Sequence, residues 1–243
     1  MQRVQNFDIL TMSYFFLCPL FVVYREKICR QLKVMSLKKQ LLLRNVLPVA
    51  LMAVLVFVKP SGLAVTFAVP YLLIEKLVTK TPFAEIGLNI KGLLKDIQKN
   101  WWLMLLPVVS GIAAVALSQF LVPEFFAHVL ERTKPILVMD QLAVLIPQLL
   151  LLALGEEIAF RAFMQGKLMG CIRPAGAIVI TSLLFALAHL SQGAPLVVAY
   201  DLLFIFIDSL LYGVLFYKTK NAYVSTLSHF IANLVGILIV FAF

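Results

Sequence analysis

The sequence predicts an all-α membrane protein: a polytopic transmembrane helical bundle of about eight spans, with one amphipathic helix lying in the membrane interface. Of its 243 residues, 62% are hydrophobic and only 14% are charged, whereas a soluble domain carries about 25% charged residues. The apolar residues form continuous runs, and roughly 18 such residues suffice to cross a bilayer. Because lipid cannot satisfy backbone hydrogen bonds and the runs do not alternate, helices are favoured over a barrel.

Eight apolar runs mark the expected spans. They cover Phe7–Tyr24, Leu41–Val58, Gly62–Val78, Trp101–Val122, Ile136–Met164, Ala175–Leu190, Leu196–Tyr217 and Tyr223–Phe243. Only Lys59, Pro60 and Ser61 separate the second run from the third, which predicts a tight hairpin there.

A more polar segment, Pro82–Asn100, separates the third run from the fourth. Its apolar residues recur at helical spacing and its lysines occupy the opposite face, which is typical of an amphipathic helix in the interface. An ordinary soluble loop helix is the alternative. Trp101 and Trp102 follow directly, and tryptophan is enriched at the level of the lipid headgroups.

The basic residues indicate an orientation. Seven lysines and arginines lie in Arg25–Arg44, and most others fall in alternate connections further along the chain. By the positive-inside rule these connections are cytoplasmic and both termini are outside. The net charge of +9 then follows from topology and contact with anionic lipid, so membrane lipid is an expected partner and nucleic acid is not.

Two adjacent carboxylates, Glu156 and Glu157, lie in the fifth apolar run, where an ionisable residue is costly and usually functional. Glu157 and Arg161 are four residues apart in the order that favours an ion pair on a helix. Glu156 points about 100° away from Glu157, so it has no local partner and faces another part of the bundle.

The chain has three histidines. His128 falls in an expected outside loop, where we predict that it is solvated. His189 and His229 fall inside apolar runs, and Asn233 shares a helix face with His229 at four-residue spacing. A single buried histidine is more often structural, but two beside an unpaired glutamate favour a site.

Helix arithmetic tests whether these side chains can meet. At about 1.5 Å per residue, Glu156 and His189 both lie roughly 25 Å from the turn between their runs. His229 lies roughly 15 Å from its own turn, about 10 Å off that level. The geometry therefore requires the segment after Arg161 to protrude or bend.

The residue types suit peptide hydrolysis. A carboxylate beside an imidazole can hold and deprotonate a water molecule, and the His229 ring and the Asn233 amide can donate to an oxyanion. The zinc-protease signature HExxH is absent. Two histidines and a glutamate can nevertheless bind Zn²⁺, and that set would be Glu156, His189 and His229.

At these residues the chain resembles a known family. Three ordered patterns carry the resemblance: Glu156-Glu157-x-x-x-Arg161, Phe185-x-x-x-His189 and His229-x-x-x-Asn233. They resemble the motifs of the CPBP family, which comprises CAAX prenyl proteases and the bacteriocin-processing or self-immunity proteins also called Abi proteins. The resemblance covers about residues 150–235.

The resemblance implies an intramembrane endopeptidase that cleaves a membrane-associated peptide or lipidated protein. The implied catalytic set is Glu156, Glu157, His189, His229 and Asn233. In it, Glu156 and His189 would activate water, and His229 and Asn233 would form the oxyanion hole. Glu157 would support the site, as would Arg161 and Phe185. We favour a mechanism without a metal, with Zn²⁺ as the alternative cofactor.

Two further expectations concern the wider molecule. Asp208 and Tyr212, on one helix face, would line a substrate groove or make structural hydrogen bonds. Residues 1–100 would form N-terminal spans and the interfacial helix, and residues 101–243 the CPBP-like catalytic core, in a bacterial plasma membrane. Two other functions remain open: a non-catalytic immunity or scaffold protein that binds another membrane protein, and a transporter, although no repeats of the kind transporters show are evident.

Overall fold

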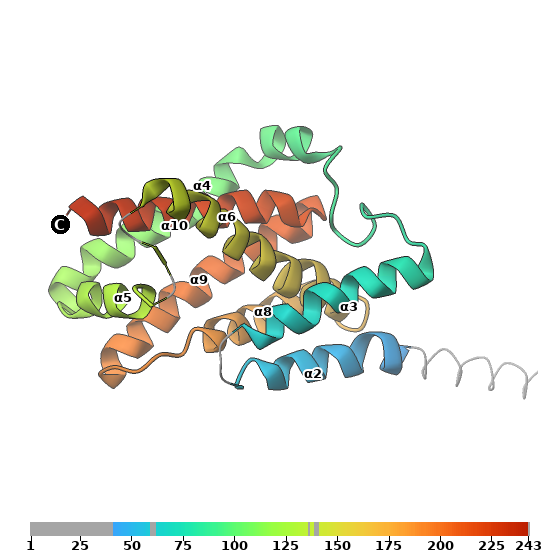
Figure 1. Ribbon diagram of the computed structural model, residues 1–243, viewed down its shortest axis with the longest axis horizontal. Coiled ribbons are helices and arrows are strands. Elements are labelled where there is room, and N and C mark those ends of the chain that lie inside the picture. Colours follow the sequence, from blue (N-terminus) through green and yellow to red (C-terminus); the bar gives the residue numbers. More distant parts are fainter. Residues whose placement is uncertain (1–40, 59–61, 136, 139–140, 243) are drawn as a thin grey trace, which may run out of the picture. The chain divides into compact units, whose positions relative to one another are not determined.

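The computed structural model describes residues 41–58, 62–135, 137–138 and 141–242 of the chain, with side chains described as far as residue 239 (Figure 1). The chain divides into two units, Met1–Arg44 and Asn45–Phe243. The expected span Phe7–Tyr24 and most of the basic segment after it lie outside the described residues. Every candidate site residue lies in the second unit.

Helices make up all the regular structure of the described residues, so the all-α class is confirmed for them. A short π-helix, η1 (Leu42–Val46), comes first and a second one, η2, lies mid-chain. In order the remaining elements are α2 (Leu47–Leu55), α3 (Leu63–Thr79), α4 (Leu93–Leu121), α5 (Phe125–Thr133), α6 (Leu142–Glu157), η2 (Ile158–Gln165), α7 (Gly166–Met169), α8 (Pro174–Ala188), α9 (Pro195–Thr219) and α10 (Ala222–Ala242).

Four helical segments of the described part are long and apolar enough to cross a membrane. They are Leu93–Leu121, the continuous run Leu142–Met169 formed by α6, η2 and α7, Pro195–Thr219 and Ala222–Ile239. Leu42–Leu55 and Pro174–Ala188 are apolar but shorter. Helix lengths therefore support a polytopic bundle, and they do not establish the expected count of about eight spans.

The helices pack around α9 and α10. Within the second unit, α10 packs against both α4 and α6, while α9 packs against α4 and α8, and η2 lies against α3 and α8 (Figure 1). Residues of η2 join α2 and α3 in the largest apolar core, to which Phe163 and Met164 contribute fully buried side chains. The end of α6 and the start of η2 are therefore enclosed by α3, α8, α9 and α10.

The expected amphipathic helix over Pro82–Asn100 is wrong in its first half. Residues 82–92 contain turns and no helix, and helix begins only at Leu93, the first residue of α4. Gly87 has φ +87°, a left-handed conformation that breaks a helix, and the ring of Phe216 approaches it closely. The segment instead packs inward: Leu88 is buried, and the Gly87 carbonyl accepts a hydrogen bond from the backbone of Ala222.

The expectation that His128 is solvated is also wrong. His128 lies in α5, a helix that the apolar runs do not predict, and its side chain is buried. Its Nε2 lies 3.5 Å from Asp201 of α9 and 3.2 Å from the Ser191 hydroxyl. Arg132, one turn later in α5, also lies 3.3 Å from the Asp201 carboxylate. These contacts between distant segments leave no local signal in the sequence.

Candidate active site

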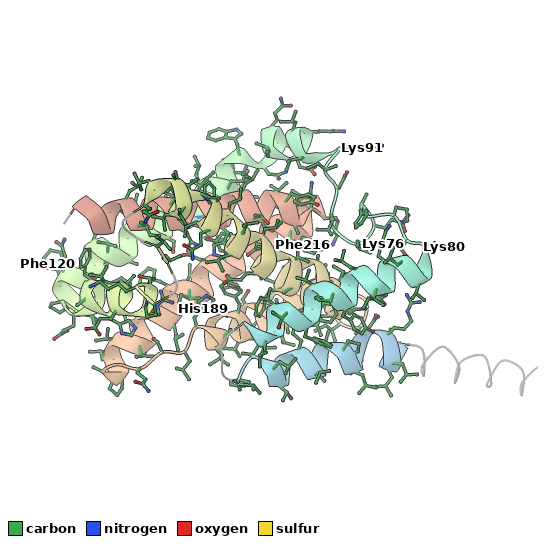
Figure 2. The ribbon with its side chains drawn as sticks, in the orientation of Figure 1. Lys76, Lys80, Lys91, Phe120, His189 and Phe216 are labelled. Atoms are coloured by element: carbon green, nitrogen blue, oxygen red, sulfur yellow. The ribbon has the colours of Figure 1, made fainter. Side chains whose placement is uncertain are left out.

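Three polar side chains that are distant in the sequence meet inside the bundle. Glu156 is in the last turn of α6, His189 directly follows α8, and His229 lies in α10. One oxygen of Glu156, Oε2, lies 4.0 Å from His189 Nε2 and 3.9 Å from His229 Nε2. Figure 2 labels His189 where α8 ends, among the surrounding helices. One carboxylate oxygen thus faces the same ring nitrogen of two imidazoles.

The other nitrogen of each histidine ring is held by an acceptor. His189 Nδ1 lies 2.8 Å from the Phe185 carbonyl oxygen, and His229 Nδ1 lies 3.2 Å from Glu157 Oε1. A carbonyl or an ionised carboxylate can only accept, so each Nδ1 must carry the hydrogen. In the neutral rings both Nε2 atoms therefore present lone pairs toward Glu156.

Glu157 and Arg161 form a fully buried ion pair, as their spacing predicted. Arg161 Nε donates to Glu157 Oε2 over 3.1 Å, and neither side chain has any exposure. A second guanidinium nitrogen donates to the Ser209 hydroxyl over 2.7 Å. Buried charges require such additional hydrogen bonds to offset their loss of hydration. The pair therefore joins the α6–η2 run to α9 and, through His229, to α10.

Aromatic rings hold the two imidazoles in place. The Phe185 ring lies 4.7 Å from the His189 ring and 5.9 Å from the His229 ring, between centroids. Tyr212 stacks on His229 at 4.8 Å with an interplanar angle of 22°. The guanidinium of Arg161 lies 5.4 Å above the Phe185 ring. Phe185, predicted as a support residue, is thus in contact with both histidines and with the ion pair.

The predicted mismatch in depth between His229 and the other two residues does not occur. α6 runs obliquely to α10 (Figure 1), so residue counts along the two axes do not measure the same depth. The segment after Glu157 is also a π-helix, Ile158–Gln165, rather than a regular α-helix. Such segments are frequent at functional sites because the wider turn shifts the side chains that follow.

The remaining candidates lie around this centre. Asn233 is half-buried, one turn beyond His229 on the same face of α10, and makes no hydrogen bond within the described residues. Tyr212 is almost fully buried against His229. Asp208, one turn earlier in α9, is half-buried, with one carboxylate oxygen that lacks a hydrogen bond among the described groups. A substrate groove along Asp208 and Tyr212 stays a prediction.

The donors do not fit a metal as they stand. In tetrahedral zinc coordination, ligand distances of about 2.0–2.2 Å place donor atoms about 3.4 Å apart. Here Glu156 Oε2 is 3.9–4.0 Å from the two Nε2 atoms. Among the described residues, no group of three or more histidine, cysteine, aspartate or glutamate side chains is arranged to hold a metal ion.

Several residues that contact the site have no signal in the sequence. Ser209 binds Arg161, and the Gln165 amide donates to the Gly213 carbonyl over 2.8 Å, both 48 residues away along the chain. Further along the same run, Lys167 pairs with Glu75 over 2.6 Å in a cleft of about 660 Å³. Only a tertiary arrangement reveals these contacts, because each joins two different helices.

Residues 138–235 match the family model described as Type II CAAX prenyl endopeptidase Rce1-like. This part of the chain matches the CAAX protease family. The matched region extends from just before α6 into α10, and so includes Glu156, His189, His229 and Asn233. In the same comparisons no curated protein and no solved structure matched the chain.

The family assignment confirms the resemblance predicted from the three motifs. The match is to a family of membrane proteases, and with four helices long enough to cross a bilayer it indicates an integral membrane protein. The match assigns no role to an individual residue.

The two adjacent glutamates are expected to differ in their effect on stability. Glu157→Gln removes the counter-charge of a buried arginine, which costs about 3–5 kcal/mol. Glu156→Gln changes a side chain that is 26% exposed and makes no hydrogen bond among the described residues, so we expect a change within about 0.5 kcal/mol. Thermal unfolding of both variants in detergent measures the difference. Equal losses of stability would contradict a structural role for Glu157 that Glu156 does not share.

Proposed function

We propose that the chain is an intramembrane endopeptidase in which Glu156, with His189, activates the water that hydrolyses a peptide bond. The observation that carries the proposal is the position of Glu156 Oε2 between two imidazole nitrogens, at 4.0 and 3.9 Å. The substrate would be a membrane-associated peptide or a lipidated protein, as the CAAX prenyl endopeptidase description suggests.

The spacing of these groups suits a water molecule. About 4 Å is too long for a hydrogen bond, but it suits two groups that each bind the same water at about 2.8 Å. The water would donate one hydrogen to Glu156 and the other to the lone pair on His189 Nε2. Its oxygen then attacks the substrate carbonyl, Glu156 takes the proton, and Glu156 returns that proton to the leaving amine.

His229 would act as an oxyanion donor in its protonated form. Its Nδ1–H is committed to Glu157, so only an imidazolium has an Nε2–H to donate. The Glu157 carboxylate stabilises that cation, and the stacked Tyr212 ring fixes its plane. Asn233, one turn further along α10, would supply the second donor. Donors arranged in advance for a developing oxyanion contribute strongly to catalysis in a site that excludes water.

Replacing either residue that binds the water should abolish cleavage. We expect Glu156→Gln and His189→Ala to lower turnover about 100-fold or more, with the exposed Glu124→Gln as the matched control. The assay uses the full chain in liposomes with two quenched probes: a prenylated Cys-a-a-X peptide and an apolar leader peptide without a lipid. Cleavage that persists in folded Glu156→Gln protein would refute the mechanism. Binding of another membrane protein without cleavage would favour the immunity or scaffold alternative.

We propose that the reaction needs no metal ion, which the 3.9–4.0 Å donor spacing supports. Full activity is therefore expected after treatment with EDTA or 1,10-phenanthroline, with less than one metal ion per chain by elemental analysis. The Nδ1 hydrogen bonds of His189 and His229 are also of the kind that metal-binding histidines make. Loss of activity with chelator, and recovery with Zn²⁺ alone, would assign the metal to these histidines and Glu156.

We also propose an orientation for the bundle in a bacterial plasma membrane, with the basic connections in the cytoplasm. Figure 2 shows Lys76, Lys80 and Lys91 toward one end of the second unit, apart from His189. Lys76 lies over the Phe83 ring at 4.1 Å, and Lys218 lies over the Trp102 ring at 5.6 Å. Lysine and aromatic residues together are typical of the membrane interface, and lysine marks its cytoplasmic side.

Single cysteines test the orientation. In a chain without its native cysteines, Lys80→Cys should resist a membrane-impermeant thiol reagent in intact cells, whereas Glu124→Cys should react. Both should react after the cells are opened, which controls for accessibility. The reverse pattern in intact cells would place the basic end outside.

A further inference from the structure

Four buried polar atoms of η2 and α8 lack hydrogen-bond partners within the described part of the chain. They are Arg161 Nη1, Gln165 Oε1, Thr181 Oγ1 and Ser182 Oγ. All four side chains have no exposure. Two come from η2 and two from α8, and these two elements pack against each other.

Gly213 of α9 brings the first two together. A Cβ atom placed on this glycine would lie 3.1 Å from Gln165 Oε1 and 3.6 Å from Arg161 Nη1. The other atoms of these side chains are already bound, since Gln165 Nε2 donates to the Gly213 carbonyl and Arg161 Nη2 donates to Ser209. The amide oxygen and the guanidinium nitrogen are therefore oriented toward the space beside Gly213.

α8 brings the two hydroxyls to the same place. Ile178, Thr181, Ser182 and Phe185 follow helical spacing and share one buried face. Ile178 Cγ2 lies 3.0 Å from the Cβ position of Gly213, and the Phe185 ring lies under the Arg161 guanidinium. Thr181 and Ser182 lie between these two contacts in the sequence, on the buried face of α8 that packs against η2 and α9.

These hydroxyls differ from those of several threonines in the described helices. Thr79, Thr219 and Thr226 each donate to the carbonyl four residues earlier in their own helix. That local bond is the ordinary way for a hydroxyl to be satisfied in a helix. Thr181 and Ser182 do not make it, so their hydroxyls remain able to bond to a group outside their own helix.

We propose that Arg161, Gln165, Thr181 and Ser182 form an internal water site holding at least one ordered water. A water can accept from Arg161 Nη1, donate to the amide oxygen of Gln165 and bond to both hydroxyls. Buried waters typically make two to four such bonds. This water is structural and separate from the one at Glu156. It links η2 to α8 beside the Glu157–Arg161 pair, and it does not depend on the proposed enzymatic activity.

The direction in which one substitution changes the unfolding temperature tests the proposed water site. Thr181→Val keeps the shape of the side chain and removes the hydroxyl. If the site holds water, the variant loses a hydrogen bond, and its unfolding temperature should fall by about 2–4 °C. If the site is dry, the variant removes an unsatisfied buried group, and its unfolding temperature should rise.

Thr226→Val is the matched control, since it removes a buried hydroxyl that bonds within its own helix; we expect a smaller change there. An increase in unfolding temperature for Thr181→Val would overturn the proposal. If that variant does not fold, an experimental density map of the unaltered chain decides. Density within hydrogen-bond distance of at least three of the four atoms supports the water, and an empty site overturns it.

Discussion

The buried ion pair of Glu157 and Arg161 is the interaction on which the rest of the site depends. Two charges without exposure are tolerated only where further hydrogen bonds satisfy them. Arg161 donates to Ser209 on α9 and lies over the Phe185 ring on α8. Glu157 accepts a hydrogen bond from His229 on α10. Because these requirements must be met together, one pair fixes the register of the α6–η2 run against three other helices.

This constraint also explains why two glutamates stand side by side. Successive residues of a helix point about 100° apart, so when Glu157 turns into the packed interior, Glu156 faces a different direction. It remains 26% exposed and directed at two imidazole nitrogens. The structural glutamate orients His229, and the neighbouring glutamate is left available for a water molecule. A single carboxylate could not serve both purposes, since both oxygens of Glu157 are already bound, one to Arg161 and one to His229.

The sequence was sufficient for features that depend on local spacing. Apolar runs predicted most of the helices of the described residues, and four-residue spacing predicted the Glu157–Arg161 pair, which the structure confirms. The sequence was insufficient where contacts between distant segments determine the position of a side chain. His128 is buried because α9 supplies Asp201, and the level of His229 depends on the oblique crossing of α6 and α10. Neither leaves a trace in local composition.

The proposed function requires the bundle to bind water while its helices stay packed, and the α6–η2 run would contribute to two separate water sites. At its N-terminal side, Glu156 stays partly exposed beside His189, where a reacting water can enter and leave. Four residues beyond Glu157, Arg161 contributes Nη1 to the proposed internal water site. Because the two proposed sites use different side chains, exchange of water at the first need not disturb the packing at the second.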